Sequence, residues 1–164
     1  MTTRTICVVV LLSAGLFLPE DRILAGSRNE APNEVELELA GKCLLYSFSY
    51  QRMLAEPFGL ELGVSMLGGG SSESSTSIVF FTVGGKIYFI QKNASPYIGG
   101  GIVSISASTS SGPFGDSGSG SYGYVTPGFE YRSEGGFLMR GSVYALITSD
   151  GFFVWPGLTV GVAF

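Results

Sequence analysis

The chain has 164 residues, a length that suits one ordinary domain, and its charged residues make up only 13% of the total, against roughly 25% in a typical soluble domain. The net charge of −4 offers no basic surface for nucleic acid, and the absence of histidine excludes Ser-His-Asp triads, Cys-His dyads and HExxH zinc sites. A soluble domain this poor in charge would struggle to cover its own surface. The composition therefore indicates either a soluble β-protein with a surface prone to association or a protein that is partly solvated by lipid.

Residues 1–27 have the features of a cleavable signal peptide. Arg4 supplies the positive start, residues 6–18 form an apolar core too short for the ~20 residues of a membrane-spanning helix, and small residues at 25–27 offer a cleavage site. The alternative is an uncleaved apolar segment that packs on the domain. We predict a signal peptide at 1–27, a short N-terminal segment at 28–33 and one domain at 34–164, without a transmembrane helix.

Glycine and serine clusters divide the domain into short segments in which apolar residues recur with a period of two. In 43–53, for example, Leu44, Tyr46 and Phe48 share one face. No segment has the helical period of 3.6. We therefore expect an all-β domain with strands at 34–40, 43–53, 58–68, 77–90, 95–108, 121–132, 136–148 and 152–164.

The residue types on the second face of these strands distinguish a membrane protein from a soluble sheet. A soluble strand would place lysine, glutamate and arginine there, whereas this chain has mostly glycine, serine, threonine and alanine. Small residues suit the interior of a narrow closed barrel, which leaves the large apolar face to point outward to lipid. Repeated over several strands of about ten residues, this pattern is typical of a transmembrane β-barrel.

The connections alternate between tight turns at 54–57, 91–95 and 133–136 and longer Gly/Ser-rich segments at 68–77 and 109–120. Outer-membrane barrels have short periplasmic turns, long outer loops and an even number of strands. We accordingly predict eight antiparallel strands, which close because no backbone edge can face lipid, and which leave no open pore. For residues 34–53 two alternatives stay open: a hairpin with a tight loop at 40–42, or one long strand bent at Gly41.

Several charged side chains fall on the inward face of the predicted strands. Buried ions in a narrow lumen must be paired or neutralised, so these residues form either a structural salt-bridge network, an ion or proton path, or a carboxylate pair for hydrolysis. They are Glu36, Glu38, Glu61, Lys86, Glu130, Arg132 and Arg140.

Aromatic residues of the predicted strands are candidates for the two girdles that flank the apolar band of a membrane barrel, and the alternative for some of them is a lipid-facing position or packing in the lumen. They are Tyr46, Tyr50, Tyr88, Tyr97, Tyr131 and Trp155. Cys43 is the single thiol left after cleavage of the signal peptide. It is either a reactive thiol or, as is commoner for a lone cysteine, a small strand residue.

Four stretches resemble the strands of small OmpA/OmpX-like outer-membrane barrels of Gram-negative bacteria: "ELELAGKCLLYSFSYQRM", "PYIGGGI", "GYVTPGFEYRSEGGFLMRGSVY" and "PGLTVGVAF". The resemblance covers about residues 34–164. In that family a terminal phenylalanine preceded by alternating apolar residues is read by the barrel-assembly machinery. The resemblance implies this role for Val160, Val162 and Phe164, although Ala163 and the scarcity of nearby aromatics depart from the usual signal.

We predict from these features a non-porin barrel of the bacterial outer membrane with a plugged polar lumen and a structural or surface-interaction role. Its expected partners are outer-membrane lipid, the barrel-assembly machinery and an unidentified extracellular partner. No catalytic, cofactor or metal site is predicted. The alternatives are an outer-membrane enzyme that acts on lipids, and a soluble lipocalin-like binder with an apolar interior.

Overall fold

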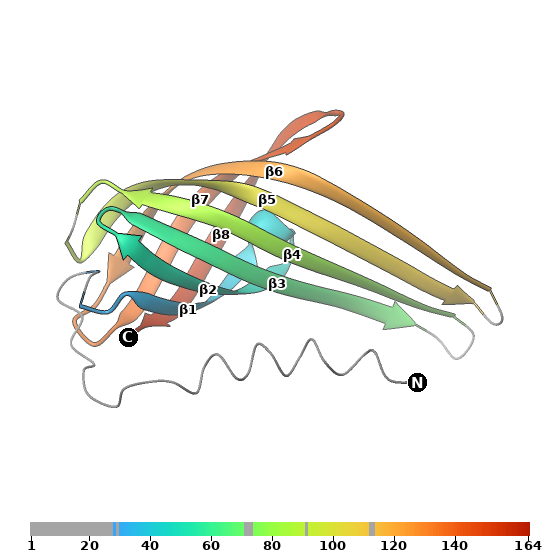
Figure 1. Ribbon diagram of the computed structural model, residues 1–164, viewed down its shortest axis with the longest axis horizontal. Helices are drawn as coiled ribbons and strands as arrows, with labels where there is room; N and C mark the ends of the chain where they lie inside the picture. The colour runs from blue at the N-terminus through green and yellow to red at the C-terminus, as the bar shows by residue number, and fades with distance from the viewer. Residues whose placement is uncertain (1–27, 29, 71–73, 91, 112–113) are drawn as a thin grey trace.

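The computed structural model describes residues 28, 30–70, 74–90, 92–111 and 114–164, and the predicted signal peptide at 1–27 lies outside these residues. Eight antiparallel strands form a closed barrel in the order β1 to β8, and β8 pairs with β1 (Figure 1). The predicted all-β, eight-stranded antiparallel barrel is therefore confirmed. No helix among the described residues is long and apolar enough to cross a membrane. The strands are β1 (Asn33–Ala40), β2 (Tyr46–Ala55), β3 (Phe58–Gly70), β4 (Ser74–Tyr88), β5 (Ala94–Ser111), β6 (Phe114–Arg132), β7 (Phe137–Thr148) and β8 (Gly151–Ala163).

The connection between β1 and β2 is a tight hairpin, which decides between the two interpretations of residues 34–53. A single 3-10 turn, η1 (Gly41–Cys43), joins the strands, and β2 begins at Tyr46 instead of residue 43. Gly41 has φ 68°, and a Cβ there would lie within 2.6 Å of the Glu38 carboxyl group, so this position requires glycine. The turn folds inward and buries Lys42 and Cys43.

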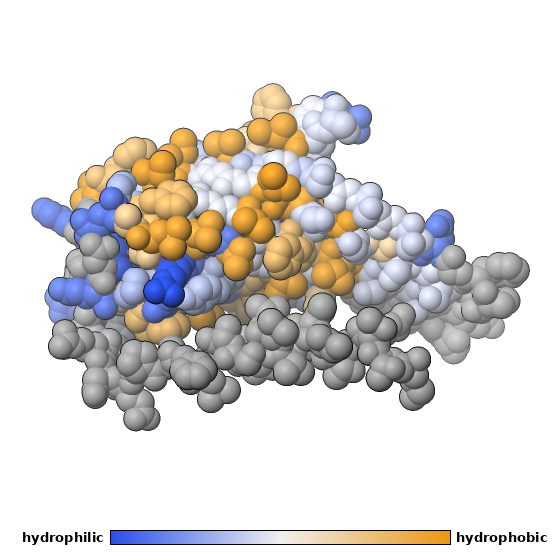
Figure 2. All heavy atoms as spheres, in the orientation of Figure 1, coloured by the Kyte–Doolittle hydropathy of each residue, from blue (hydrophilic) through white to orange (hydrophobic). Residues whose placement is uncertain are grey.

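The outer surface of the barrel is apolar. Large side chains on alternating positions of all eight strands point outward, such as Phe48 (55% exposed), Ile102 (63%) and Val154 (61%). Figure 2 shows apolar residues spread over the body of the molecule. Such a contiguous apolar exterior is unfavourable in water and suits the acyl chains of a bilayer.

Four strands continue beyond the rest of the barrel. Figure 1 shows β3, β4, β5 and β6 extending together past the end of β2. The segments 68–77 and 109–120, which we expected to be flexible loops, are largely paired strand here: Gly68 faces Ser77, and Ser108 faces Ser117. Serine and glycine suggested loops because they have weak strand propensity, but ladder hydrogen bonds to a neighbour extend the sheet through them. We call residues 65–70, 74–81, 104–111 and 114–122 the β3–β6 extension.

Candidate functional site

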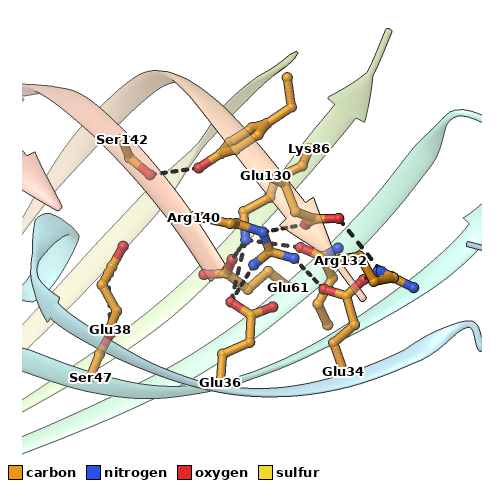
Figure 3. Close-up of polar contacts among 12 residues, drawn as sticks. Glu34, Glu36, Glu38, Ser47, Glu61, Lys86, Glu130, Arg132, Arg140 and Ser142 are labelled. Atoms are coloured by element: carbon orange, nitrogen blue, oxygen red, sulfur yellow. Dashed lines mark hydrogen bonds and ion pairs between the residues drawn. The ribbon is translucent and has the colours of Figure 1, made fainter. Parts of the chain in front are cut away.

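The interior of the barrel contains a network of buried ions, which we call the lumen ion network. Alternation along the strands turns most of these side chains inward, η1 and the segment before β1 supply the other two, and each is at most 5% exposed. Figure 3 shows most of them converging from β1, β3, β4, β6 and β7. The network consists of Arg28, Glu34, Glu36, Glu38, Lys42, Glu61, Lys86, Glu130, Arg132 and Arg140.

Arg140 on β7 is the centre of the network. Its Nε lies 2.5 Å from Glu130 Oε2, its Nη1 lies 2.5 Å from Glu36 Oε2, and its Nη2 contacts Glu34 Oε2. Nη2 also donates a hydrogen bond of 3.0 Å to the Tyr88 hydroxyl. One guanidinium thus joins three carboxylates from two strands, β1 and β6, as its planar array of donors permits (Figure 3).

Two lysines organise the part of the network nearer to η1. Lys42 Nζ lies 2.6 Å from Glu61 Oε1 and 3.0 Å from Glu38 Oε2. Lys86 Nζ contacts Glu61 Oε2, donates a hydrogen bond of 2.9 Å to Gln51 Oε1, and lies 3.7 Å from Glu36 Oε2. Glu61 therefore bridges the two lysines, and Glu36 links this cluster to Arg140.

Arg28 closes the network at the end where the chain enters the barrel. Its Nη2 lies 2.8 Å from Glu130 Oε1, and its Nη1 donates hydrogen bonds of 2.9 Å to the carbonyl oxygens of Ile90 and Lys92. The guanidinium carbon also lies 4.4 Å from the centre of the Tyr88 ring. A residue that precedes the first strand thus fills this mouth of the barrel.

Formal charges cancel inside the lumen. Among the described residues, five buried carboxylates (Glu34, Glu36, Glu38, Glu61 and Glu130) stand against five buried cations (Arg28, Lys42, Lys86, Arg132 and Arg140). Burial of an unpaired ion costs several kcal/mol, so such a core is tolerable only when every charge has a partner. The observed contacts meet this condition.

An apolar layer lies between the network and the extended end of the barrel. Phe80, Val103, Tyr124 and Leu146 are each at most 5% exposed and pack together with Cys43. Tyr144 belongs to the same cluster and donates a hydrogen bond from its hydroxyl to Glu38, which joins the two layers. Ions that entered from this end would have to cross the apolar layer first.

The comparisons with solved structures agree with this architecture. The N-terminal β-barrel domain of Pseudomonas aeruginosa OprF matches with a TM-score of 0.60 and 16% identity, over 80% of this chain and 95% of that chain. Ail, the attachment invasion locus protein of Yersinia pestis, matches with a TM-score of 0.51 and 16% identity, over 80% and 93%. Ail in complex with the heparin analogue sucrose octasulfate matches with a TM-score of 0.51 and 17% identity, over 80% and 94%.

The fold is that of an outer-membrane β-barrel. No protein-family model matches the chain, and no curated protein matches it. At these identities the likeness concerns the fold.

The structure places all seven predicted lumen residues inside the barrel, within one network. Sequence reasoning missed Glu34, although it alternates with Glu36 and Glu38 in "EVELELA" and shares their face. It also missed Lys42 and Arg28. Lys42 lies in a turn, where strand alternation no longer gives the direction of a side chain, and Arg28 lies outside the barrel strands, so no periodic signal marks either residue.

The six predicted girdle aromatics divide into two groups. Tyr50, Tyr131 and Trp155 are exposed on the outside, and Tyr46 is half-buried. Tyr88 and Tyr97 are not girdle residues but pack in the lumen, the alternative for some of these aromatics, since they are 1% and 2% exposed with ring centres 5.6 Å apart. Their hydroxyls bind Glu130 and Ser142, respectively. A tyrosine that can reach a polar partner is accommodated in such an interior.

The last strand closes the barrel against β1. Val160 faces Leu37 and Val162 faces Val35 across this seam, and Val162 is exposed on the lipid side. The backbone of Phe164 exchanges hydrogen bonds of 2.8 and 3.1 Å with the backbone of Asn33. The predicted assembly residues thus occupy the terminal seam of the barrel.

Cys43 lies in the turn η1 and not in a strand as expected, and it is fully buried in the apolar layer. Burial raises the pKa of its thiol to about 12, because the thiolate would be formed away from water. Since the thiolate is the reactive form, the thiol in this position is inert at neutral pH.

Proposed function

We propose that this chain is a small barrel of the outer membrane of a Gram-negative bacterium, closed to ions and with a structural or surface-interaction role. The observation that carries the proposal is the orientation of its side chains. Large apolar groups cover the outside, and paired ions fill the inside. This inside-out arrangement is stable where the surrounding solvent is lipid.

Closure of the lumen is supported by two successive barriers. The lumen ion network holds its charges in direct contact, with Arg140 bound to three carboxylates. The apolar layer formed around Phe80 and Leu146 adds a zone that water and ions enter at high cost. An eight-stranded barrel has an interior just wide enough for side chains, and here they occupy it.

The orientation in the membrane follows from the two ends of the barrel. Short turns at 56–57 and 133–136 lie at the end that also holds Asn33 and Phe164, whereas the β3–β6 extension lies at the other end. Outer-membrane barrels keep their short turns in the periplasm. The β3–β6 extension accordingly projects outside the cell and is the part available to partners.

This proposal is preferred over both alternatives. A lipocalin-like binder needs an apolar interior, whereas the interior here is ionic at its centre. A lipid-acting enzyme needs a group free to transfer protons at the lipid surface, whereas Glu34, Glu36 and Glu130 are buried and held by Arg140.

Two further parts of the proposal concern biogenesis. Residues 1–27 direct export and are then removed, and the terminal seam with Val160, Val162 and Phe164 is recognised by the barrel-assembly machinery. The first is supported by the apolar core and small residues of that segment, and the second by the pairing of Phe164 with Asn33.

The test is expression of the full chain, followed by membrane fractionation, gel mobility with and without heating, and conductance in planar bilayers. We expect outer-membrane fractions, a heat-modifiable band and no porin-like open channel. A protein that stays soluble without detergent, or one that opens stable porin-sized channels, would contradict the proposal. A lipid-hydrolysis assay on the same preparation addresses the enzyme alternative.

A further inference from the structure

Arg52 is the only cation that the described strands carry on the outer face of the barrel. Alternation along β2 turns it outward, where it is exposed, while its neighbours in sequence point into the lumen. The other cations of the strands, Lys86, Arg132 and Arg140, are buried inside. No ion pair or side-chain hydrogen bond joins Arg52 to another described residue. Every cation of the lumen ion network has a carboxylate partner, whereas this charge has none in the described part of the chain.

Arg52 lies near the end of the barrel that holds the short turn at 56–57. It faces Asn33, the first residue of β1, across the β1–β2 ladder, and the backbone of Asn33 pairs with Phe164 at the terminal seam. In the proposed orientation this level corresponds to the headgroups of the inner leaflet. A charge on the lipid-facing surface costs far less there than at the middle of the bilayer.

A second hydrogen-bond donor lies beside Arg52 on the same face. The Tyr50 hydroxyl donates a hydrogen bond of 2.6 Å to Asn33 Oδ1, which fixes the orientation of the amide. Asn33 Nδ2 donates a hydrogen bond of 3.3 Å to the carbonyl oxygen of Phe164, and no described residue accepts its second N–H. Residues that face each other in an antiparallel ladder have Cβ atoms about 5 Å apart, so one anion can reach the Arg52 guanidinium and this N–H together.

We propose that Arg52, assisted by Asn33, binds the phosphate group of a phospholipid in the inner leaflet of the outer membrane. A guanidinium offers two parallel N–H donors that match two phosphate oxygens, and it stays charged in proteins. The Asn33 amide supplies a further donor. The inference rests on the proposed function, which sets the barrel in the outer membrane, and it names the lipid headgroup that this surface fits.

The surroundings of Arg52 favour a lipid over a soluble anion. Leu60, which faces Arg52 on β3, is 38% exposed, and Leu54 and Tyr50 on β2 are 57% and 37% exposed. A ligand that covers this surface must therefore combine an anionic group with apolar chains. A phospholipid has both, whereas an acidic peptide or a free phosphate would leave the apolar side chains uncovered.

The position of Arg52 along the barrel selects the leaflet. The β3–β6 extension lies at the opposite end of the barrel. Its described residues contain no lysine or arginine, so they offer no cation to the phosphates of lipids in the outer leaflet. The inference therefore concerns the inner leaflet alone.

The test titrates the full barrel, in a non-ionic detergent without phosphate, with two lipids and measures bound lipid by native mass spectrometry. Dioleoylphosphatidylglycerol carries the phosphate, and dioleoyl glucosylglycerol has the same acyl chains with an uncharged sugar headgroup. Three variants are compared with the unchanged chain: Arg52→Met removes the charge, Arg52→Lys keeps it without the planar pair of donors, and Tyr131→Phe removes an exposed hydroxyl from β6 at the same end. Heat-modifiable mobility shows that each variant has folded.

We expect phosphatidylglycerol to bind at least about tenfold more tightly than the sugar lipid, Arg52→Met to abolish this preference, Arg52→Lys to keep part of it, and Tyr131→Phe to change the affinity by less than about twofold. In nuclear magnetic resonance spectra, phosphatidylglycerol should shift the Arg52 Nε–H signal and the Asn33 side-chain amide signals, and leave the arginines of the lumen unchanged. Equal affinity for the two lipids, an unchanged preference in Arg52→Met, equal losses in Arg52→Met and Tyr131→Phe, or shifts confined to the lumen arginines would each overturn the inference. A barrel that fractionates with outer membranes but shows no preference for the phosphate lipid refutes the inference and leaves the proposed function standing.

Discussion

Replacement of Arg140 by methionine should destabilise the barrel strongly. The substitution keeps most of the side-chain volume but removes the cation that holds Glu34, Glu36 and Glu130. Removing one partner of a buried ion pair costs about 3–5 kcal/mol, because the remaining charge stays buried and unpaired.

The remaining contacts show which carboxylate contributes most to this loss of stability. Glu130 keeps Arg28 at 2.8 Å, and Glu34 keeps its contact with Arg132. Glu36 keeps only Lys86, at 3.7 Å. We therefore expect a loss of about 3–5 kcal/mol for Arg140→Met, and recovery of a large part of it in the double variant Arg140→Met/Glu36→Gln, in which lumen charges again balance.

Unfolding by denaturant in detergent micelles, followed through the fluorescence of Trp155 and heat-modifiable mobility, measures these free energies. The matched control is Arg52→Met, since Arg52 is exposed on the outside of β2, and it should change the free energy of unfolding by less than about 0.5 kcal/mol. A loss below about 1 kcal/mol for Arg140→Met, or a double variant no more stable than the single one, would refute the account of the lumen as a balanced ionic core.

Three further changes probe packing, burial and assembly. Gly63→Ala would place a Cβ within 2.6 Å of two buried hydroxyl oxygens, so we expect the free energy of unfolding in denaturant to fall by about 1–3 kcal/mol. The control Gly141→Ala should change this free energy little, because a Cβ there meets nothing within 4 Å. Cys43 should resist maleimide labelling at neutral pH in the folded barrel and react after unfolding; equally fast labelling in both states would contradict its burial and raised pKa. Phe164→Ser should lower the yield of barrel in the outer membrane of cells without impairing refolding into detergent, while Phe152→Ser, on the exposed part of β8, should leave both unchanged.

The alternation of side chains contains most of the information on the fold. Strand number, strand direction and the lipid-facing surface follow from period-two patterns, because a barrel in lipid must place opposite chemistry on its two faces. The same pattern places Tyr88 inside, since it alternates with Ile87 and Phe89, which are exposed. Residue type alone left a girdle and the lumen open for Tyr88, and its position along the strand decides between them.

Strand ends could not be predicted in this way. Gly68 and Ser117 have weak strand propensity, yet both lie in regular ladders because their neighbours are already paired. Conversely, residues 43–45 have the composition of a strand, but the positive φ values of Gly41 and Leu44 turn the chain there. Pairing with neighbouring strands decided the first case, and local backbone conformation decided the second.

The residues of the lumen ion network could be predicted only in part from the sequence, for a related reason. Alternation shows that Glu61 and Arg140 point inward. It does not show which charges meet, because Arg140 binds both Glu130 on the neighbouring strand β6 and Glu36 on the more distant strand β1. Lys42 enters the lumen through a turn, and its contacts with Glu38 and Glu61 exist only once the hairpin has folded inward.

Arg28 links the lumen to the processing of the chain. Without it the described lumen would hold five carboxylates and four cations, and the carbonyl oxygens of Ile90 and Lys92 would lose their donor. The proposed cleavage of residues 1–27 leaves this arginine at the start of the mature chain. A cleavage site even one residue later would remove the cation that closes this mouth of the barrel, so the position of cleavage and the charge balance of the lumen constrain each other.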